Sequence, residues 1–457
     1  MKDLTTGNEA KLIFSFALPM LIGNIFQQLY NTVDSIIVGK VLGKGALAAV
    51  GTSFPVVFLL VSLIMGVTMG TTILIAQYFG AREMEKVKKT IDTAYIFLLI
   101  ASVVITALGL LLSGPILTLL KAPADVLPLA RQYLNIIFVG ITATFGYNSI
   151  SAILRGLGDS KTPLYFLIIA SVVNTVLDLL FIMVFHWGVA GAAWATVIAQ
   201  GLSFLFGLYY LNRTHELFIF NPREMKFDWN IFSLSIKIGL PTGIQQMLVG
   251  TGFMALFRIV NGFGTTVTAA YTAASGIDSF ASMPAMNLSA AVSSFVGQNL
   301  GGNKPERVRK GHLAALGMSV AISVVMAVIA ILFRRELMSL FNSDPQVIEV
   351  GARYLLIVSS FYVVFSVMFT TNGVMRGAGD TVIPLISTIF SLWLIRIPAA
   401  ALLSQRLGSD GIWWGTPVGW LFGMFFSVIY YRTGRWKRKV AIRRPANAEM
   451  AGEVEPR

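Results

Sequence analysis

Twelve long apolar segments constrain the fold of this 457-residue chain. A helix that crosses a bilayer needs roughly 20 mostly apolar residues, and each segment reaches about that length with at most an occasional charge. They are residues 12–39, 46–79, 93–120, 132–154, 163–185, 189–211, 238–260, 267–299, 311–333, 354–375, 381–403 and 411–431. Such runs exclude a β-barrel, whose strands would alternate over about ten residues. The sequence therefore predicts an all-α polytopic membrane protein with twelve transmembrane helices.

The composition agrees with this prediction. Charged residues make up 12% of the chain, whereas a soluble protein carries about 25%, so no soluble catalytic domain is expected. The chain has no cysteine, which excludes disulfides, thiolate metal sites and cysteine nucleophiles. Its three histidines, His186, His215 and His312, show no metal-ligand spacing and are expected in solvated loops at helix ends.

The excess of basic residues predicts an orientation. The formal net charge is +13, and most Lys and Arg residues fall in the two tails and the even-numbered loops. Because cytoplasmic loops carry an excess of Lys and Arg, we expect both termini in the cytoplasm and a multi-pass protein of the cell inner (plasma) membrane. Lys310 and Arg438 are then inside, and Trp187 is outside. No basic domain accompanies this charge, so we expect no nucleic-acid partner.

An internal repeat divides the chain at an offset of 221 residues. The motif Gln77-Tyr-Phe-Gly80 recurs as Gln298-Asn-Leu-Gly301, and Arg155-Gly-Leu-Gly-Asp159 recurs as Arg376-Gly-Ala-Gly-Asp380. Each half holds six predicted helices, so both halves enter the membrane in the same direction. This pattern predicts two six-helix bundles related by pseudo-two-fold symmetry along the membrane normal. The expected parts are an N-terminal lobe at 1–211, a cytoplasmic linker at 212–236, a C-terminal lobe at 237–431 and a basic cytoplasmic tail at 432–457.

The two Arg-Gly-x-Gly-Asp motifs fall in predicted cytoplasmic loops. Their glycines permit tight turns, and an arginine at a helix C-terminus interacts favourably with the helix dipole. A structural role is the favoured interpretation. The alternative is a cytoplasmic gate that closes through these charges.

Five charged residues lie within the predicted spans, where an Asp or Arg costs roughly 2.5 to 3.5 kcal/mol at a helix centre. They are Asp34, Asp178, Arg258, Asp278 and Arg396. Because pairing lowers the burial cost of both partners, we favour a structural ion pair between Asp278 and an arginine over contact of Asp278 with substrate.

Oxygen-bearing side chains gather at one depth in the first half. Asp34, Asp178 and Thr196 all fall about 8 to 11 Å below the outer surface at the helical rise per residue. Asn174 lies one turn deeper on the same face as Asp178. Such a cluster can hold a small cation such as sodium, or let two carboxylates share a proton. The alternative is a set of interhelical hydrogen bonds worth about 0.6 kcal/mol each. Only Thr416 preserves this pattern in the second half.

A cavity between the two halves is expected near the membrane midplane. Methionine suits a site that accepts many shapes, although packing in the core or against lipid is the alternative for any single methionine. The candidate residues of this substrate cavity are Gln245, Gln246, Met254, Asp278, Met283 and Met286. Pro19 favours a kink in the helix that carries Asp34, so bending at Pro19 is expected to link ion occupancy to cavity shape.

Several motifs together resemble the multidrug and toxic compound extrusion (MATE) family, in the bacterial and archaeal branch similar to DinF. They are Tyr30-Asn-Thr-Val-Asp34, the stretch at 174–178, Ala273-Ala-Ser-Gly-Ile-Asp278 and the repeated Arg-Gly-x-Gly-Asp. The resemblance implies an antiporter that expels organic cations and other amphiphilic drugs in exchange for sodium ions or protons. It also implies that the cation and proton site lies at Asp34, Asn174, Asp178 and Thr196. The helix 7 glutamate typical of the NorM-like branch is missing.

Two other functions compete with drug antiport. A flippase for lipid-linked oligosaccharides has a related architecture but needs a strongly cationic cavity, whereas the spans here contain three acids and two arginines. A membrane-embedded enzyme needs converging nucleophiles, bases or metal ligands, and the sequence has no H-E-x-x-H or G-x-S-x-G motif. We expect no cofactor other than the coupling ion. The expected partners are small amphiphilic or cationic substrates and membrane lipids, with the protein acting as a monomer.

Overall fold

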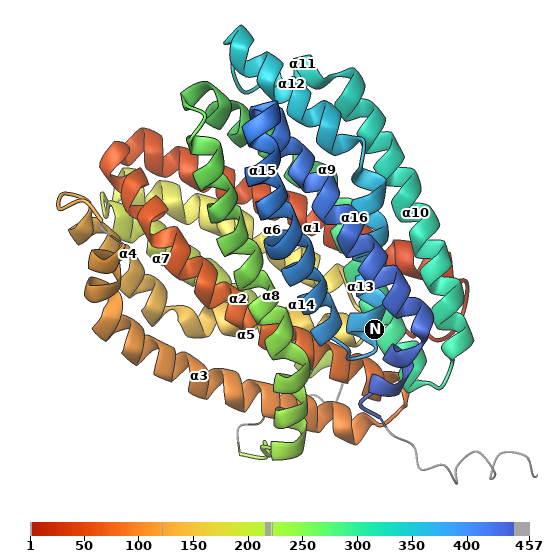
Figure 1. Ribbon diagram of the computed structural model, residues 1–457. Coiled ribbons are helices and arrows are strands. Elements are labelled where there is room, and N and C mark those ends of the chain that lie inside the picture. The colour runs from red at the N-terminus through yellow and green to blue at the C-terminus, as the bar shows by residue number, and fades with distance from the viewer. Residues whose placement is uncertain (1, 121, 215–220, 222, 443–457) are drawn as a thin grey trace, which may run out of the picture.

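The computed structural model describes residues 2–120, 122–214, 221 and 223–442, and these residues form helices joined by short connections. The first half contains α1 (Glu9–Ile37), α2 (Lys44–Gly80), α3 (Met84–Leu119), α4 (Leu127–Val139), α5 (Ile141–Gly156), α6 (Lys161–Leu179) and α7 (Val189–Thr214). The second half contains α8 (Trp229–Asn261), α9 (Thr265–Gly301), α10 (Pro305–Leu332), α11 (Arg334–Ser339), α12 (Pro345–Ser359), α13 (Tyr362–Gly377), α14 (Val382–Thr388), α15 (Ile397–Leu407) and α16 (Ser409–Thr433). Figure 1 shows their arrangement.

Four shorter helical segments continue or follow these helices. Three are π-helical, with a wider turn than an α-helix, and one is a 3₁₀-helix after α16. They are η1 (Val38–Leu42), η2 (Leu180–Val184), η4 (Ile389–Arg396) and the 3₁₀-helix η5 (Arg435–Lys439).

The helices account for all twelve predicted segments. Nine described helices, counting their π-helical continuations, are long and apolar enough to cross a membrane. Two further spans are pairs of helices bent at their junction, α4 with α5 by 51° and α12 with α13 by 50°. The remaining segment is the 37-residue α9. The bends fall at matching places in the two halves, as the sequence repeat predicts.

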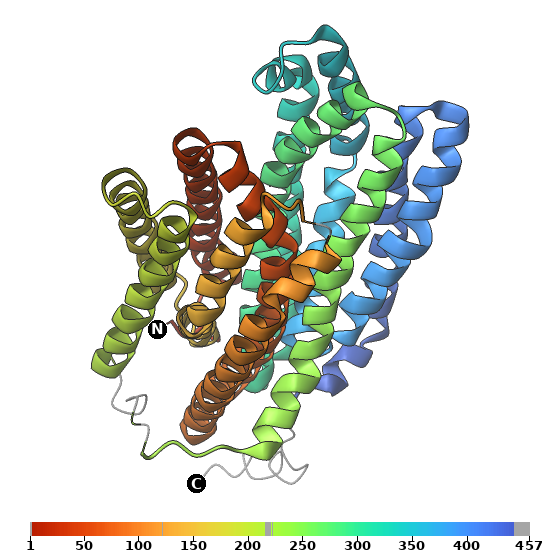
Figure 2. The ribbon, with the colours of Figure 1, turned by 90° about the vertical axis from the view of Figure 1, so that its left-hand side faces the viewer.

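The helices form two lobes. In Figure 2 those of the first half, coloured red to olive, lie mainly on the left, and those of the second half, coloured green to blue, lie on the right. The predicted all-α, two-lobe architecture is therefore confirmed. The predicted lobe boundaries stay predictions, since α8 already begins at Trp229 and residues 215–220, 222 and 443–457 of the predicted linker and tail lie outside the described residues.

Glycines let α2 of one lobe approach α8 of the other. A Cβ atom added to Gly70 would lie 2.1 Å from the carbonyl oxygen of Ser235, and one added to Gly239 would lie 2.3 Å from that of Gly66. Real Cβ atoms do not come this close to a backbone oxygen. Because glycine has no side chain, α2 and α8 can pack with their backbones in contact, and this contact fixes the distance between the two lobes at this point.

The lobes pack most tightly at one end of the bundle, which we call the terminal end because both described chain ends lie there. The last turns of α2 and α9, which contact each other, are buried almost without interruption at 70–78 and 287–299. At the opposite end, called the far end, large side chains such as Phe54 and Phe253 are exposed. The molecule is thus closed between the lobes at its terminal end.

The three histidines lie in different surroundings. His186 is exposed in the turn between η2 and α7, as predicted, and His215 lies outside the described residues. The prediction for His312 is wrong. Its side chain is buried within α10, and Nε2 lies 3.3 Å from Oγ1 of Thr371. A histidine near a helix start resembles a loop residue in sequence, but here a neighbouring helix covers it.

Candidate functional site

The predicted oxygen cluster is assembled from three helices of the first half. Asp34 lies near the far end of α1, Asn174 and Asp178 lie on α6, and Thr196 lies on α7. The helices α1 and α6 both continue as π-helical segments just beyond their aspartates. Single π-helical turns occur frequently at functional sites.

Hydrogen bonds join the three helices at this site. The Nδ2 of Asn174 donates to Oγ1 of Thr196 at 3.3 Å, and the hydroxyl of Tyr30 lies 3.4 Å from the same oxygen. The threonine hydroxyl in turn donates to the carbonyl oxygen of Ala192 at 3.1 Å. Thr196 thus joins α1, α6 and α7 at the level of the predicted site.

The two carboxyl groups lie near each other. Asp34 and Asp178 are close enough to interact electrostatically. Two ionised carboxylates at this range repel, so one of them must carry a proton or a cation must lie between them. This arrangement agrees with the sequence prediction of a shared cation or proton site.

Four buried oxygens at this site have no hydrogen-bond donor among the described residues. They are Oδ1 of Asp34, Oδ1 of Asn174 and both carboxylate oxygens of Asp178. The side chain of Asp178 is 0% exposed. Because a buried acceptor without a partner is costly, these oxygens need a proton, a cation or water. Their oxygen-only chemistry fits a hard cation such as sodium.

A small cavity of about 40 Å³ opens directly beside the cluster. This volume is large enough to hold a water molecule or an ion of similar size. Its lining includes Asn174 and Thr196, Tyr30 of the family motif, and polar side chains that the sequence did not single out, namely Gln27, Tyr147, Ser171 and Gln200. Asn174 and Thr196 of the cluster thus face a small space within the first lobe.

Two tyrosines complete the site and were missed as site residues. Tyr30 bonds to Thr196, and Tyr133 on α4 lies close enough to both aspartates to interact with them electrostatically. Tyr30 precedes Asp34 by four positions, so it lies on the same helix face. That spacing is a signal in the sequence. Tyr133 had no comparable signal.

The charged residues of the second half do not form the predicted ion pair. Asp278 accepts a hydrogen bond from the hydroxyl of Tyr354 at 3.4 Å, and no arginine nitrogen among the described residues lies within 4.0 Å of it. Arg258 is exposed near the end of α8. Arg396 is buried, with its guanidinium 5.7 Å from the ring centroid of Phe253. The aspartate is therefore stabilised by a tyrosine hydroxyl instead of a salt bridge.

The candidate cavity residues differ in exposure. Met254 and Met286 are exposed, while Gln246, Asp278 and Met283 are partly buried. Gln245 must be removed from the predicted cavity because it is buried and its amide is already used. Its Nε2 donates to Oγ1 of Thr388 at 2.7 Å, and its Oε1 accepts from Arg376 at 3.1 Å. The amide joins helices inside the second lobe.

Pro19 is buried within the uninterrupted helix α1. One turn further along, Nδ2 of Asn24 donates to Oδ1 of Asn287 on α9 at 3.0 Å. The helix that carries Asp34 is thus attached to the opposite lobe close to its proline.

Several known proteins are similar to this chain in sequence and in fold. A family model described as MatE matches residues 19–180 and again residues 241–402. The "Probable multidrug resistance protein YpnP" of Bacillus subtilis (strain 168) is 40% identical over 95% of this chain and 97% of its own length. A second protein of that organism, "Probable multidrug resistance protein YoeA", is 31% identical over 93% of both chains. A solved structure described as the outward-facing conformation of a multidrug resistance MATE family transporter of the MOP superfamily has a TM-score of 0.90 and 26% identity, covering 96% of this chain and 99% of that chain.

Proposed function

Because this chain belongs to the MATE family of multidrug efflux transporters, we propose that it is a secondary active antiporter. It exports organic cations and other amphiphilic drugs in exchange for sodium ions or protons. Its substrates approach from the cytoplasm and leave at the far end, which faces the outside. Both termini are cytoplasmic, and the protein is a monomer in the inner (plasma) membrane.

One observation carries the proposal, namely the four buried oxygens of Asp34, Asn174 and Asp178 without a donor. Water, a cation or a proton can satisfy these oxygens, but only a cation or a proton also removes the repulsion between the two carboxylates. Occupancy removes the repulsion between the carboxylates of α1 and α6 and so changes how these helices pack. The driving ion therefore binds within the first lobe and changes the packing of helices there.

The helix α1 connects this ion site to the cavity between the lobes. Asp34 lies near its far end, and Asn24 bonds to Asn287 of the second lobe. Pro19 removes one backbone donor from this helix and provides a place where it can bend. Ion binding at Asp34 can therefore change the position of α1 against the other lobe. Because coupling between two binding sites is reciprocal, the ion and the drug then weaken each other's binding by the same factor.

Dye efflux from proteoliposomes tests the proposal. An imposed sodium gradient and an imposed proton gradient are applied in turn to wild-type protein and to Asp34→Asn and Asp178→Asn variants. We expect one gradient to drive efflux in the wild type and neither gradient to drive it in the variants. The control is Ser35→Ala, which removes an exposed hydroxyl that bonds only within α1. Normal gradient-driven efflux by either asparagine variant would remove that aspartate from the site.

A further inference from the structure

Two buried glutamines cross-link the lobes at the terminal end. Gln77 near the end of α2 and Gln298 at the matching place in α9 are each 0% exposed. The Nε2 of Gln77 donates to the carbonyl oxygen of Gly377 in the second lobe at 3.0 Å. The Nε2 of Gln298 donates to the carbonyl oxygen of Gly156 in the first lobe at 3.1 Å. Each glutamine therefore binds the Arg-Gly-x-Gly-Asp turn of the opposite lobe.

The side-chain oxygen of each glutamine accepts a hydrogen bond from a segment outside the two bundles, one before α1 and one after α16. The backbone N–H of Leu4 donates to Oε1 of Gln298 at 2.9 Å, and that of Ala441 donates to Oε1 of Gln77 at 2.9 Å. We call residues 2–7 the N-terminal strap and residues 439–442 the C-terminal strap. In each glutamine the amide nitrogen thus makes a cross-lobe contact and the amide oxygen a strap contact.

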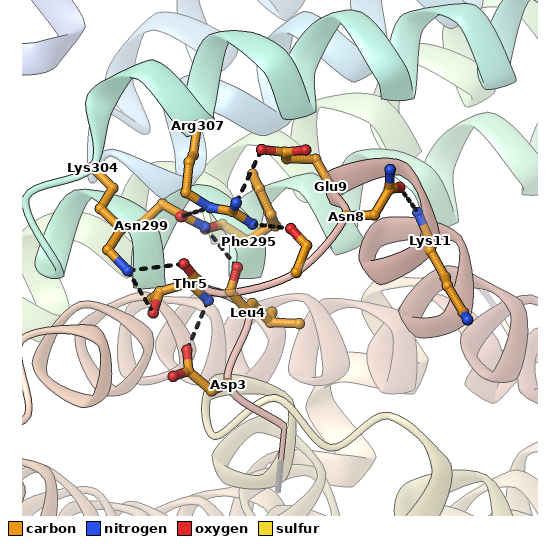
Figure 3. Close-up of polar contacts among 11 residues, drawn as sticks. Asp3, Leu4, Thr5, Asn8, Glu9, Lys11, Phe295, Asn299, Lys304 and Arg307 are labelled. Carbon is orange, nitrogen blue, oxygen red and sulfur yellow. Dashed lines mark hydrogen bonds and ion pairs between the residues drawn. The ribbon is translucent and has the colours of Figure 1, made fainter.

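Figure 3 shows how the N-terminal strap is held on the second lobe, although it precedes the first helix of the first lobe. The Nζ of Lys304 donates to the carbonyl oxygen of Thr5 at 2.9 Å, and Nη2 of Arg307 donates to that of Gly7 at 2.9 Å. Arg307 also forms an ion pair with Glu9 at 3.0 Å. This strap crosses from its own lobe to the other one.

The C-terminal strap crosses in the opposite direction. It follows α16 of the second lobe, yet Ala441 and Ile442 pack against the apolar core of the first lobe that contains Ile73 and Leu74. The two chain ends are not copies of each other in the sequence repeat. They nevertheless bind the two repeated glutamines in the same way.

The second glycine of each Arg-Gly-x-Gly-Asp turn makes room for a strap. Gly158 and Gly379 have φ angles of +83° and +89°, which favour glycine. A Cβ atom on Gly158 would lie 2.1 Å from the carbonyl oxygen of Lys2, and one on Gly379 would lie 3.2 Å from that of Lys439. Each strap therefore lies between a glutamine of one lobe and a glycine of the other.

We propose that Gln77, Gln298 and the two straps form a gate that holds the terminal end closed, and that both straps must detach in every transport cycle. The proposal rests on the proposed function, because alternating access requires the two ends of the cavity to open in turn. The lobes cannot part at the terminal end while each strap binds both of them. The glycine carbonyls and buried amides, instead of the arginine and aspartate charges, close this gate.

Thiol labelling measures strap detachment without any transport assay. The chain has no cysteine, and Thr5 of the N-terminal strap is buried while the strap is docked, so a maleimide reacts with purified Thr5→Cys protein only when the strap opens. Adding Gln298→Ala removes the acceptor of the Leu4 amide and is expected to raise the labelling rate about tenfold, as for loss of a buried hydrogen bond. Gln132→Ala, an exposed glutamine on α4, is the matched control. Equal rates in the Gln298→Ala and Gln132→Ala backgrounds overturn the proposal.

A reversible disulfide tests whether detachment is part of the cycle. A Cβ atom on Gly302 would lie 3.5 Å from Cγ2 of Thr5, close enough for a disulfide in the Thr5→Cys/Gly302→Cys double variant. Oxidation is expected to reduce efflux at least tenfold and reduction to restore it, with each single variant as control. Unchanged efflux by the oxidised double variant contradicts the gate. If wild-type protein shows no ion-driven efflux, the proposed function fails, while the labelling rates still decide whether the straps open.

Discussion

The two aspartates of the first lobe differ in their surroundings. Asp178 is completely buried on α6, whereas Asp34 on α1 is partly exposed. In the proposed antiporter we therefore expect an ion from the far end to meet Asp34 before Asp178. Because each carboxylate sets the charge state of the other, we treat them as one functional unit.

Replacing both aspartates by asparagine tests whether they act as one functional unit. The Asp34→Asn/Asp178→Asn double variant is expected to transport no worse than either single variant, because members of one functional unit are strongly non-additive. All three should still insert, since each loses a membrane-embedded charge. Efflux rates and substrate binding with and without the driving gradient measure both effects. Two independent, additive losses would show that the aspartates act separately.

Removing the Tyr30 hydroxyl is expected to weaken ion coupling. Tyr30→Phe deletes the contact with Thr196, and one hydrogen bond worth about 1 kcal/mol corresponds to roughly a fivefold change in apparent ion affinity. Efflux rate against driving-ion concentration gives that affinity. Tyr165→Phe, a change at an exposed tyrosine on α6, is the control. Identical ion dependence in both variants would mean that Tyr30 has no part in the site.

The sequence singled out the two carboxylates together with Asn174 and Thr196, and it missed the tyrosines beside them. Asp34 and Asp178 stand out because carboxylates are costly in an apolar helix, and Asn174 follows from helical spacing. Tyrosines are ordinary in membrane spans, so Tyr133 had no distinguishing signal. Gln245 was wrongly assigned to the substrate cavity. Its amide forms hydrogen bonds with Arg376 and Thr388, which are more than 100 positions away and cannot be recognised from the neighbouring sequence.

At the level of elements, the lengths of the apolar runs predicted where the helices lie but not where an α-helix changes into a π-helix. The twelve spans follow from runs of apolar residues, and each predicted run corresponds to a helix or a bent pair of helices. The π-helical segments η1, η2 and η4 were not predicted. A single wider turn changes little in a mostly apolar run, so nothing in the sequence marks these segments.

A glycine substitution tests the contact between α2 and α8. Gly70→Ala places a methyl group 2.1 Å from the carbonyl oxygen of Ser235 and is expected to destabilise the closed terminal end by about 1 to 3 kcal/mol, as overpacking does. Gly51→Ala on the same helix, with nothing within 4 Å of the added atom, is the control. The labelling rate of the Thr5→Cys protein and its thermal stability report the effect. If Gly70→Ala resembles Gly51→Ala in both, the lobes do not depend on this contact.

At the scale of the whole molecule, the repeat predicted two similar lobes, and the structure contains them. What the repeat did not predict is how the lobes are held together. The straps lie outside the repeated region, and their contacts join residues about 300 positions apart, such as Leu4 and Gln298. Contacts of that range leave no periodic pattern in a single sequence.

The cysteine-free chain also permits a direct test of orientation. Trp187→Cys and Lys310→Cys place single thiols at exposed positions at opposite ends of the bundle. An impermeant maleimide added to intact cells is expected to label the first variant and not the second, because the proposed orientation places the terminal end in the cytoplasm. Permeabilised cells provide the control, in which both variants react. The reverse pattern in intact cells would invert the proposed orientation.

The crossed straps have a consequence for biosynthesis. Ala441 follows all twelve spans, so the N-terminal strap can dock as soon as α9 and α10 are in the membrane, whereas the C-terminal strap can dock only after every span has been made. A chain that stops after α16 would contain every membrane-spanning helix and the complete ion site, but only half of the gate. We expect such a truncated product to be made and inserted normally and yet to leak ions across the membrane, so the segment that follows α16 matters for membrane integrity.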